Sequence, residues 1–275
     1  MKPKAFDYVR ATSVNEVLSV LASEGEDARI IAGGMSLVAM MNFRLVEPKV
    51  LVDIMNIEEL SHIRVENGYV EVGAGVRQAR LMAWPELRTH IPLYAQALPH
   101  VGHYQTRARG TVCGSIAHCD PSSEQPLCFL TLGGSVVLRS ARGTRVVPAE
   151  EFLVGMLATS RRPDELVVAV RFPVASPKAG YYFEEMTQRH GDFAICAVAA
   201  VAEGNVVRLG VGGVAERSTV REWTGLAEVD IGDALNQYAW ELGGSDDIHA
   251  TAEYRRQLVR RLGRRAILEA RKCRK

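Results

Sequence analysis

The order of short strands and helices along the chain constrains its fold more than any other feature. Residues 29–32 and 49–54 are rich in β-branched and apolar side chains, and they flank an expected helix over 36–45. Residues 181–211 hold three strand-like runs in succession, and the pattern is helical from residue 230 onward. Runs of strands followed by runs of helices predict an α+β architecture, with an antiparallel sheet and helices in the C-terminal part.

Local signals predict several element boundaries. Ser13 and Glu16 form a capping-box pair ahead of an amphipathic helix, for which Gly25 is the stop signal. Asn67-Gly68 between two apolar runs predicts a tight β-hairpin, and residues 135–147 predict a second hairpin. Further elements are expected as helices over 76–84, 91–98 and 125–132, and as a strand over 166–172.

The length of the chain favours more than one domain. At 275 residues, with 47% hydrophobic and 24% charged residues, the chain suits roughly two globular domains. The segment 175–180 contains proline, serine and glycine and is the best candidate for a linker. We therefore expect one domain over residues 1–175 and another over residues 180–275.

Charge and cysteine content exclude several classes of protein. Thirty-three Lys and Arg residues against 32 Asp and Glu residues leave a net charge of +1, which argues against a nucleic-acid partner. No apolar run approaches the roughly 18 residues of a membrane span, and the N-terminus lacks the apolar core of a signal peptide. Five cysteines form an odd, sparse set that suits a reducing compartment. We therefore expect a cytoplasmic protein without a membrane span.

A glycine pair between a strand and a helix is the first candidate for a binding loop. Gly33 and Gly34 allow positive φ angles and let a ligand approach the backbone closely. Ser36 could cap the following helix, and exposed N–H groups at this point suit a phosphate. The alternative interpretation is a tight turn with no ligand, because isolated glycine motifs are weak signals.

A second loop also combines small residues, hydroxyls and an irregular backbone. Residues 102–120 follow no helical or strand period, and residues 110–121 contain Gly110, Thr111, Gly114 and Ser115. Neither loop carries the Gly-Lys-Ser/Thr ending of a P-loop or the G-x-G-x-x-G of a Rossmann turn. Two such loops could grip a pyrophosphate from two sides, mostly with backbone and hydroxyl donors.

Residues 100–128 gather three histidines and three cysteines, which raises the question of a metal. The cysteines are separated by five and then eight residues, which fits neither zinc nor iron–sulfur spacing, so we expect no metal site. A nucleophilic pair, for example Cys119 or Cys113 with His118, stays open because spacing does not give its geometry. Most of these cysteines are expected to be small buried hydrophobic residues.

Two features of the C-terminal part have a structural and a functional interpretation. By residue type, Phe193 is expected in the core at the start of a strand, and the alternative is a ring that packs on a planar ligand. The last stretch is rich in arginine on one face, with Leu258, Leu262, Ile267 and Leu268 on the other. A solvated or subunit-contacting face is favoured over a nucleic-acid patch, since no recognised motif accompanies these arginines.

Taken in order, these motifs resemble a known family. The chain is similar to the FAD-binding medium subunit of molybdenum hydroxylases, which includes the flavoprotein subunit of aerobic carbon monoxide dehydrogenase and the flavin domain of xanthine dehydrogenase. The resemblance spans the whole chain and rests on five segments: residues 3–8, 32–37, 109–121, 189–194 and 248–256.

The resemblance implies a fold and a set of cofactor contacts. It implies a two-part FAD-binding domain of the vanillyl-alcohol-oxidase (PCMH) type over residues 1–175, with subdomains at about 1–56 and 57–175. Residues 32–37 and 111–115 would wrap the FAD pyrophosphate, Glu124 would contact the adenosine ribose, and Val167 the adenine end or the flavin. The expected cofactor-binding residues are Ala32, Gly33, Gly34, Met35, Ser36, Leu37, Val101, Gly110, Thr111, Cys113, Gly114, Ser115, Ala117, His118, Asp120, Glu124, Val167 and Phe193.

The sequence departs from the family pattern at two positions. Cys113 replaces the first glycine of the second loop, and we expect its bulk to alter the backbone path where it meets phosphate. Phe193 stands where a tyrosine is common near the isoalloxazine, so a hydroxyl is lost there. The four-cysteine iron–sulfur insertion found in part of the family has no counterpart in this sequence.

The resemblance also implies an activity and partners. It implies an electron-transfer flavoprotein subunit that receives electrons from two [2Fe-2S] clusters in a small subunit, in a complex whose large subunit carries the molybdopterin cofactor. A heterohexamer of two three-subunit units is the expected assembly, and no catalytic side chain is expected here because the flavin is the reactive group. One alternative is a stand-alone flavin oxidoreductase with His118 or His190 as acid or base. The other is a scaffold subunit that has lost FAD, and Cys113 is the feature that favours it.

Overall fold

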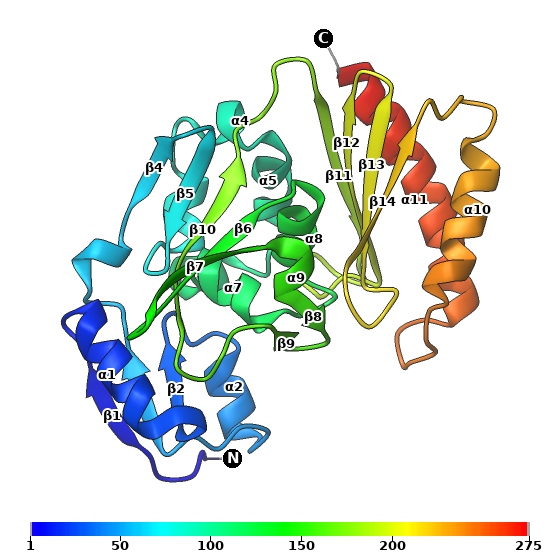
Figure 1. Cartoon of the computed structure of the whole chain (residues 1–275). Coiled ribbons are helices and arrows are strands. Elements are labelled where there is room, and N and C mark those ends of the chain that lie inside the picture. The colour runs from blue at the N-terminus through cyan, green and yellow to red at the C-terminus, as the bar shows by residue number, and fades with distance from the viewer. Residues whose placement is uncertain (1, 274–275) are drawn as a thin grey trace.

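Three larger sheets and a two-stranded ribbon organise the described residues, as the computed structural model in Figure 1 shows. The structure describes residues 2–273. A small parallel sheet lies near the N-terminus, a larger antiparallel sheet follows, and a second antiparallel sheet carries the C-terminal helices. The α+β class and the C-terminal antiparallel sheet with helices are confirmed.

The N-terminal sheet consists of β1 (Asp7–Arg10), β3 (Val50–Asp53) and β2 (Ala28–Ile31), paired in parallel in that order. The crossovers are α1 (Val14–Glu24) with the 3-10 turn η1 (Gly25–Asp27), and α2 (Leu37–Asn42). The predicted capping pair is present: Ser13 Oγ accepts from the Glu16 amide at 3.2 Å, while the Glu16 carboxylate accepts from the Thr12 amide at 2.8 Å. Gly25 is the C-cap of α1, so both ends of this helix could be predicted from the local sequence.

The central sheet pairs β4 (Ile63–Glu66), β5 (Tyr69–Gly73), β10 (Leu166–Pro173), β6 (Ser135–Ser140) and β7 (Gly143–Pro148). Both predicted hairpins occur in it, and Asn67 and Gly68 take positive φ angles of 52° and 79° at the first turn. Such angles are those of the tight hairpin turn that Asn-Gly favours. A two-stranded ribbon of β8 (Leu153–Gly155) and β9 (Ala158–Thr159) lies between β7 and β10 in the chain.

Short helices fill the middle of the chain. They are η2 (Glu58–Leu60), α3 (Gln78–Met82), α4 (Leu87–His90), α5 (Pro92–Ala97), η3 (Leu98–His100), α6 (Tyr104–Arg109), α7 (Val112–His118), α8 (Glu124–Thr131) and α9 (Ala149–Phe152). The expectation of no regular structure over residues 102–120 is wrong, because α6 and α7 lie there. The helices expected over 36–45 and 76–84 are shorter than predicted: α2 ends before the chain enters β3, and α3 ends before the chain enters α4.

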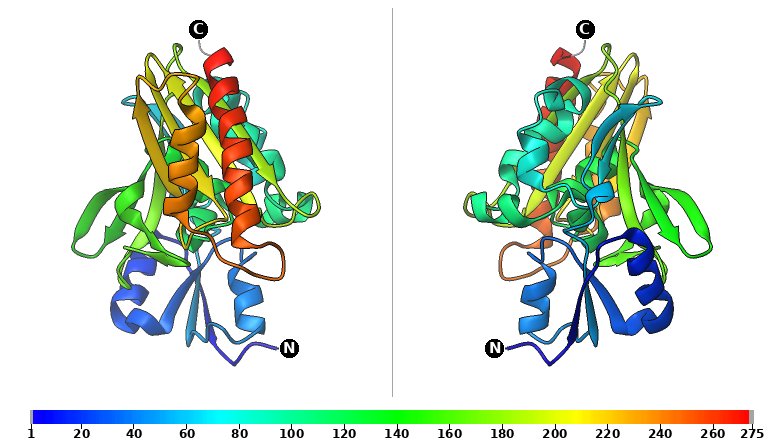
Figure 2. Two further views of the ribbon diagram at one scale, coloured as in Figure 1. Left: turned by 90° about the vertical axis from the view of Figure 1, so that its right-hand side faces the viewer. Right: turned by 90° about the vertical axis from the view of Figure 1, so that its left-hand side faces the viewer.

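The C-terminal sheet runs β11 (Gly180–Met186), β12 (Cys196–Glu203), β13 (Val206–Gly212) and β14 (Thr219–Thr224). The helices α10 (Ile231–Leu242) and α11 (Ala252–Cys273) cover its outer face (Figure 2). Alternate residues of β12 point to opposite sides: Val198 packs with the two helices, and Ala199 packs with the core of the first part of the chain. One sheet therefore joins both halves of the molecule.

The predicted linker over residues 175–180 lies in the chain between β10 of the central sheet and β11 of the C-terminal sheet. The division into domains at 1–175 and 180–275, and into subdomains near residue 56, stays a prediction. Of the described helices, none is both long and apolar enough to cross a membrane.

Candidate cofactor site

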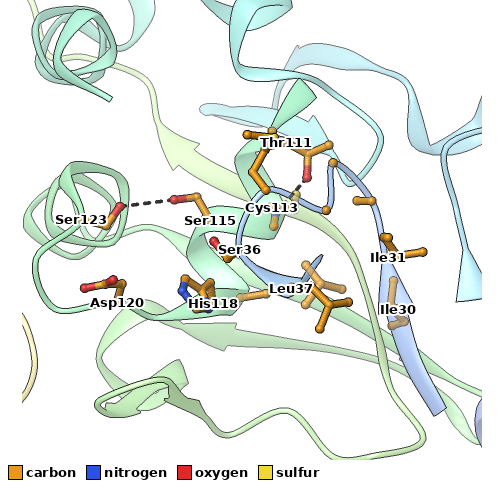
Figure 3. Close-up of a pocket in the computed structure, with 18 of the residues that line it drawn as sticks. Ile30, Ile31, Ser36, Leu37, Thr111, Cys113, Ser115, His118, Asp120 and Ser123 are labelled. Carbon is orange, nitrogen blue, oxygen red and sulfur yellow. Dashed lines mark hydrogen bonds between the residues drawn. The ribbon is translucent and has the colours of Figure 1, made fainter. Parts of the chain in front are cut away.

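A cavity of about 820 Å³ runs between the N-terminal sheet and the middle of the chain. This volume lies within the range of natural ligand sites. All the residues that the sequence predicted for cofactor binding line this one cavity, although they come from positions as far apart as Ala32 and Phe193. Figure 3 shows Asp120 and Ser123 at one end of the cavity and Ile30 and Ile31 at the other, with Ser36, Thr111 and Ser115 between them.

The first loop follows β2 and meets the second loop directly. A Cβ added to Gly33 would lie 2.3 Å from the carbonyl oxygen of Arg109 and 2.6 Å from the Cα of Gly110, so only glycine allows this approach. Gly34 has a φ of 70°, which also favours glycine. Ser36 does not cap α2 with its side chain, contrary to that prediction, because its backbone is already helical and its hydroxyl makes no capping bond.

The amides of the first loop have no partner in the protein. Within residues 2–273, the backbone N–H groups of residues 33–36 donate to no protein acceptor, and all four residues line the cavity. Buried or partly buried N–H groups require an acceptor, from water or from a ligand. Four adjacent donors of this kind suit the oxygens of an anion.

The second loop is shaped by Thr111, which caps α7. Thr111 Oγ1 accepts from the Gly114 amide at 3.1 Å, and the Ser115 hydroxyl lies 3.3 Å from that of Ser123. The expectation that Cys113 alters the backbone path near the phosphate stays a prediction, and Cys113 is among the residues that line the cavity. Its side chain is almost fully buried, and its thiol lies 3.4 Å from the carbonyl oxygen of Val72 in β5, so its bulk is directed toward the sheet.

One end of the cavity is rich in titratable groups. Burial raises the pKa of the Glu124 carboxyl to about 7, and the side chain is 5% exposed. Burial also lowers the pKa of His118, which favours its neutral form. Asp120 Oδ1 accepts from the Ser122 amide at 2.8 Å and so shapes the turn before α8.

Three apolar side chains complete the wall. Val101, just after η3, and Val167 on β10 are each 6% exposed and line the cavity. Phe193, by contrast, is 68% exposed and also lines the cavity. The expectation of a core position for Phe193 is wrong, because the turn over residues 187–194 carries it away from the sheet interior. Its exposed ring is placed as the ligand-packing alternative requires.

Of the alternative catalytic groups, His118 lines the cavity, whereas His190 and the two thiols lack features of catalytic groups. Burial raises the pKa of the Cys113 and Cys119 thiols, which disfavours the reactive thiolate. Cys119 Sγ lies 3.3 Å from the carbonyl oxygen of Gly155. His190 is exposed and does not line the cavity. Across residues 2–273, no three histidine, cysteine or acidic side chains converge as metal ligands do.

Several residues of the cavity wall were not among those predicted from the sequence. Gln78 is 4% exposed and ties the second loop to α3, since its backbone N–H donates to the Gly110 carbonyl at 2.9 Å. Arg29 on β2 and Arg161 ahead of β10 also line the cavity. Gln78 and Arg161 carry no local signal and are brought to the site by tertiary structure alone. Arg29 could have been predicted as a wall residue, because it lies on β2, the strand that leads into the first glycine loop.

The residues present fit FAD. A flavin dinucleotide needs donors for its pyrophosphate, polar partners for its sugar hydroxyls and apolar walls for its two ring systems. Residues 33–36 provide the free amides, Ser115 and Glu124 provide polar side chains, and Val101, Val167 and Phe193 provide apolar surface. The two glycine loops touch, so a single ligand can contact both.

Comparisons with known proteins agree with this geometry. The sequence model of the family described as "FAD binding domain in molybdopterin dehydrogenase" matches residues 4–175. The caffeine dehydrogenase subunit beta of Pseudomonas sp. (strain CBB1) is 43% identical over 202 residues, which cover 73% of this chain and 68% of that protein. The 6-hydroxypseudooxynicotine dehydrogenase complex subunit alpha of Paenarthrobacter nicotinovorans is 36% identical over 283 residues, which cover 98% of this chain and 96% of that protein.

A solved structure is similar over the full length. A chain of the carbon monoxide dehydrogenase from Hydrogenophaga pseudoflava superposes with a TM-score of 0.94 at 28% identity. The match covers 100% of this chain and 100% of that chain. The similarity therefore includes the C-terminal sheet and helices as well as residues 4–175.

Proposed function

We propose that this chain, which belongs to the family of FAD-binding domains in molybdopterin dehydrogenases, transfers electrons from [2Fe-2S] clusters of a partner subunit through FAD to an external acceptor. The chain is an FAD-binding medium subunit of the molybdenum hydroxylase type and thus part of an oxidoreductase. The observation that carries the proposal is the single cavity that both glycine loops and Phe193 line.

The side chains and amides of the cavity would bind and orient the cofactor. We assign the free amides of residues 33–36 and the Thr111–Ser115 turn to the pyrophosphate, and Glu124 to the adenosine ribose. We assign Val101, Val167 and Phe193 to the ring systems. The bound flavin would supply the redox chemistry, since it accepts electrons singly and delivers them in pairs. The protein's own task is to hold it in place and exclude water from its buried parts.

The partners follow from the family. We propose a large subunit with the molybdopterin cofactor and a small subunit with the [2Fe-2S] clusters, assembled as two three-subunit units. The large subunit would set the substrate. Relatives named for caffeine and 6-hydroxypseudooxynicotine support a nitrogen heterocycle as its substrate class. A cytoplasmic location remains part of this proposal.

The test is the visible absorption spectrum of the purified chain, with the released chromophore identified after denaturation. We expect one FAD per chain and neither iron nor molybdenum. Turnover of substrate by the chain alone would instead favour the stand-alone oxidoreductase. A chain that binds no FAD after incubation with it, alone or in its complex, would contradict the proposal.

A further inference from the structure

The turn that carries Phe193 to the cavity has few hydrogen bonds of its own. Residues 187–194 connect β11 to β12, and Gly191, Asp192 and Phe193 line the cavity. Among the described residues, the hydrogen bonds of this turn stay inside it: the Asp192 amide donates to the Arg189 carbonyl at 3.0 Å, and Arg189 Nε donates to the Asp192 carboxylate at 3.1 Å. Because the Phe193 ring is 68% exposed, its position depends on how the backbone of the turn is held.

One side of the turn packs on the loop after η3. A Cβ added to Gly191 would lie 2.5 Å from Cε1 of His103 and 3.1 Å from the carbonyl oxygen of Gly102, so the two segments are in close contact. This packing limits the turn on one side. The direction of its chain is set where the turn enters β12.

The base of the turn is held by a buried arginine from the last helix. Arg255 on α11 is 5% exposed, and its Nη1 donates to the carbonyl oxygen of Ile195, at 2.7 Å, and to that of Gly213. The Ile195 amide donates to the Met186 carbonyl at 2.8 Å, which closes the turn. Both backbone polar groups of Ile195 are therefore fixed, two residues after Phe193.

Gly213, which follows β13, meets the same point from the neighbouring strand. It has a φ of 76°, and a Cβ there would lie 2.6 Å from the carbonyl oxygen of Ala194 and 3.1 Å from that of Ile195. Only glycine combines this φ with so close an approach. Arg255 thus joins two segments that already touch, the entry to β12 and the end of β13.

Asp247 balances the charge of Arg255. Arg255 Nη2 donates to Asp247 Oδ2 at 2.6 Å, and Asp247 Oδ1 accepts from the amides of His249 and Ala250 at 2.8 and 2.9 Å. A buried charge needs such a partner. The planar guanidinium can serve a carboxylate and two carbonyls at once, whereas the compact ammonium of lysine cannot reproduce that fork.

We infer that Arg255 is a positioning residue for the cofactor site, and that it holds Phe193 at the cavity by fixing the backbone at Ile195. The inference rests on the proposed function, which assigns Phe193 to a ring system of FAD. None of residues 248–256 lines the cavity, although this segment is one of the five that carry the sequence resemblance. Arg255 therefore acts on FAD only through the turn, and its effect should require the Phe193 ring.

The test is a double-mutant cycle on the full chain, with FAD as the probe. Arg255→Lys keeps the charge beside Asp247 but loses the fork that spans both carbonyls. Arg256→Lys is the matched control, since it makes the same change at the next residue of α11, whose Nη1 donates to the Gly243 carbonyl at 2.7 Å. Each change is made in the wild-type chain and in Phe193→Ala. The dissociation constant of FAD is measured by flavin fluorescence, and circular dichroism checks that each variant is folded.

Positioning predicts that the two effects are not additive. We expect Arg255→Lys to weaken FAD binding about tenfold in the wild-type chain and to have no further effect in Phe193→Ala. Arg256→Lys should leave FAD binding unchanged in both. An equal loss from Arg255→Lys in both chains, or no loss in the wild-type chain, overturns the inference. If Arg255→Lys does not fold, Asp247→Asn takes its place, because it keeps the Oδ1 contacts and removes only the ion pair.

A spectroscopic reporter reads the position of residue 193 directly. An indole ring in contact with a flavin quenches the flavin fluorescence by electron transfer, which a phenylalanine ring does not do. We expect Phe193→Trp to shorten the fluorescence lifetime of bound FAD, and Arg255→Lys in that chain to reverse most of the change. Arg256→Lys should not reverse it. A lifetime that Arg255→Lys leaves unchanged, with only a lower thermal unfolding temperature, would mean that Arg255 has a structural role alone.

Failure of the proposed function has a different signature. If the wild-type chain binds no FAD, the proposed function fails, and amide hydrogen exchange over residues 187–195 of the FAD-free chain decides the positioning role. Faster exchange of this segment in Arg255→Lys than in Arg256→Lys supports the role, and equal exchange in the two variants contradicts it.

Discussion

At the scale of single residues, the cavity wall changes the chemistry of the side chains that it holds. Glu124 is buried at the start of α8, and its carboxyl therefore keeps its proton to higher pH than a solvated carboxyl does. Cys113 is equally buried, and its thiol lies 3.4 Å from the carbonyl oxygen of Val72. A substitution at Glu124 tests whether burial determines the pKa of its carboxyl.

Glu124→Gln should change the pH dependence of stability in the FAD-free chain. The carboxyl pKa is about 7 in the folded state, against an ordinary value of 4.5, so the folded chain binds the proton more tightly. Stability is then lost as the pH rises from 4.5 through 7, and glutamine removes this loss. We expect the variant to match the wild-type chain near pH 4.5 and to exceed it by about 3 kcal/mol above pH 7.

Urea unfolding at pH 5 and pH 8 measures this difference. The control Glu66→Gln alters an exposed carboxylate on β4 and should show no such pH dependence. Equal free energies of unfolding for Glu124→Gln and the wild-type chain at pH 8 would refute the role of burial.

Gly33→Ala should separate the two glycine loops. The added Cβ would lie 2.3 Å from the carbonyl oxygen of Arg109, a contact that the backbone must move to relieve. We expect a loss of about 1–3 kcal/mol in stability and weaker FAD binding. The matched control is Gly232→Ala in α10, where a Cβ meets nothing within 4 Å, and where alanine should stabilise by roughly 0.5–1 kcal/mol. Thermal unfolding and FAD titration of both variants check this, and a fully FAD-competent Gly33→Ala would show that the loops need not touch.

At the scale of elements, α7 is positioned by its cap. Thr111 accepts from the Gly114 amide, and this bond begins a helix within a stretch that has no clear period in the sequence. Hairpins and α1 could be predicted because Asn67-Gly68 and Ser13 act locally. The short helices α6 and α7 could not, since tertiary contacts stabilise them more than their own sequence does. The edge strand β14 was missed because its residues are mostly half-buried and alternate weakly.

Thr111→Asp should empty the site while keeping α7 intact. Aspartate caps helices as well as threonine does, so the cap of α7 should be kept. Because Thr111 is only 2% exposed, circular dichroism must show that the buried carboxylate leaves the fold intact. Its carboxylate would lie at the turn that we assign to the pyrophosphate, and like charges repel there. We expect FAD binding to fall at least tenfold, whereas Thr111→Ser should keep both cap and cofactor. Flavin content and circular dichroism of the two variants are the measurements, and full flavin content in Thr111→Asp would mean that this loop is assigned wrongly.

At the scale of the whole molecule, one cavity is built from segments that the sequence keeps far apart. The glycine loops could be predicted because their residue types are unusual for a strand end. The place of Arg161 in the cavity wall could not, because the segment before β10 reaches the cavity only through tertiary packing. The core position expected for Phe193 from its residue type was wrong for a related reason, since tertiary structure leaves its ring exposed at the cavity. The C-terminal sheet packs on both halves of the molecule, and its connecting turn carries Phe193 to the cavity.

The central claim is that this chain holds FAD in the cavity between its two glycine loops. The most direct test is the ratio of released FAD to protein in the purified wild-type chain and in Thr111→Asp, measured side by side. The account predicts one FAD per wild-type chain and little or none in the variant. A wild-type chain that takes up no FAD in any assembly, or a variant that retains it in full, would contradict the account.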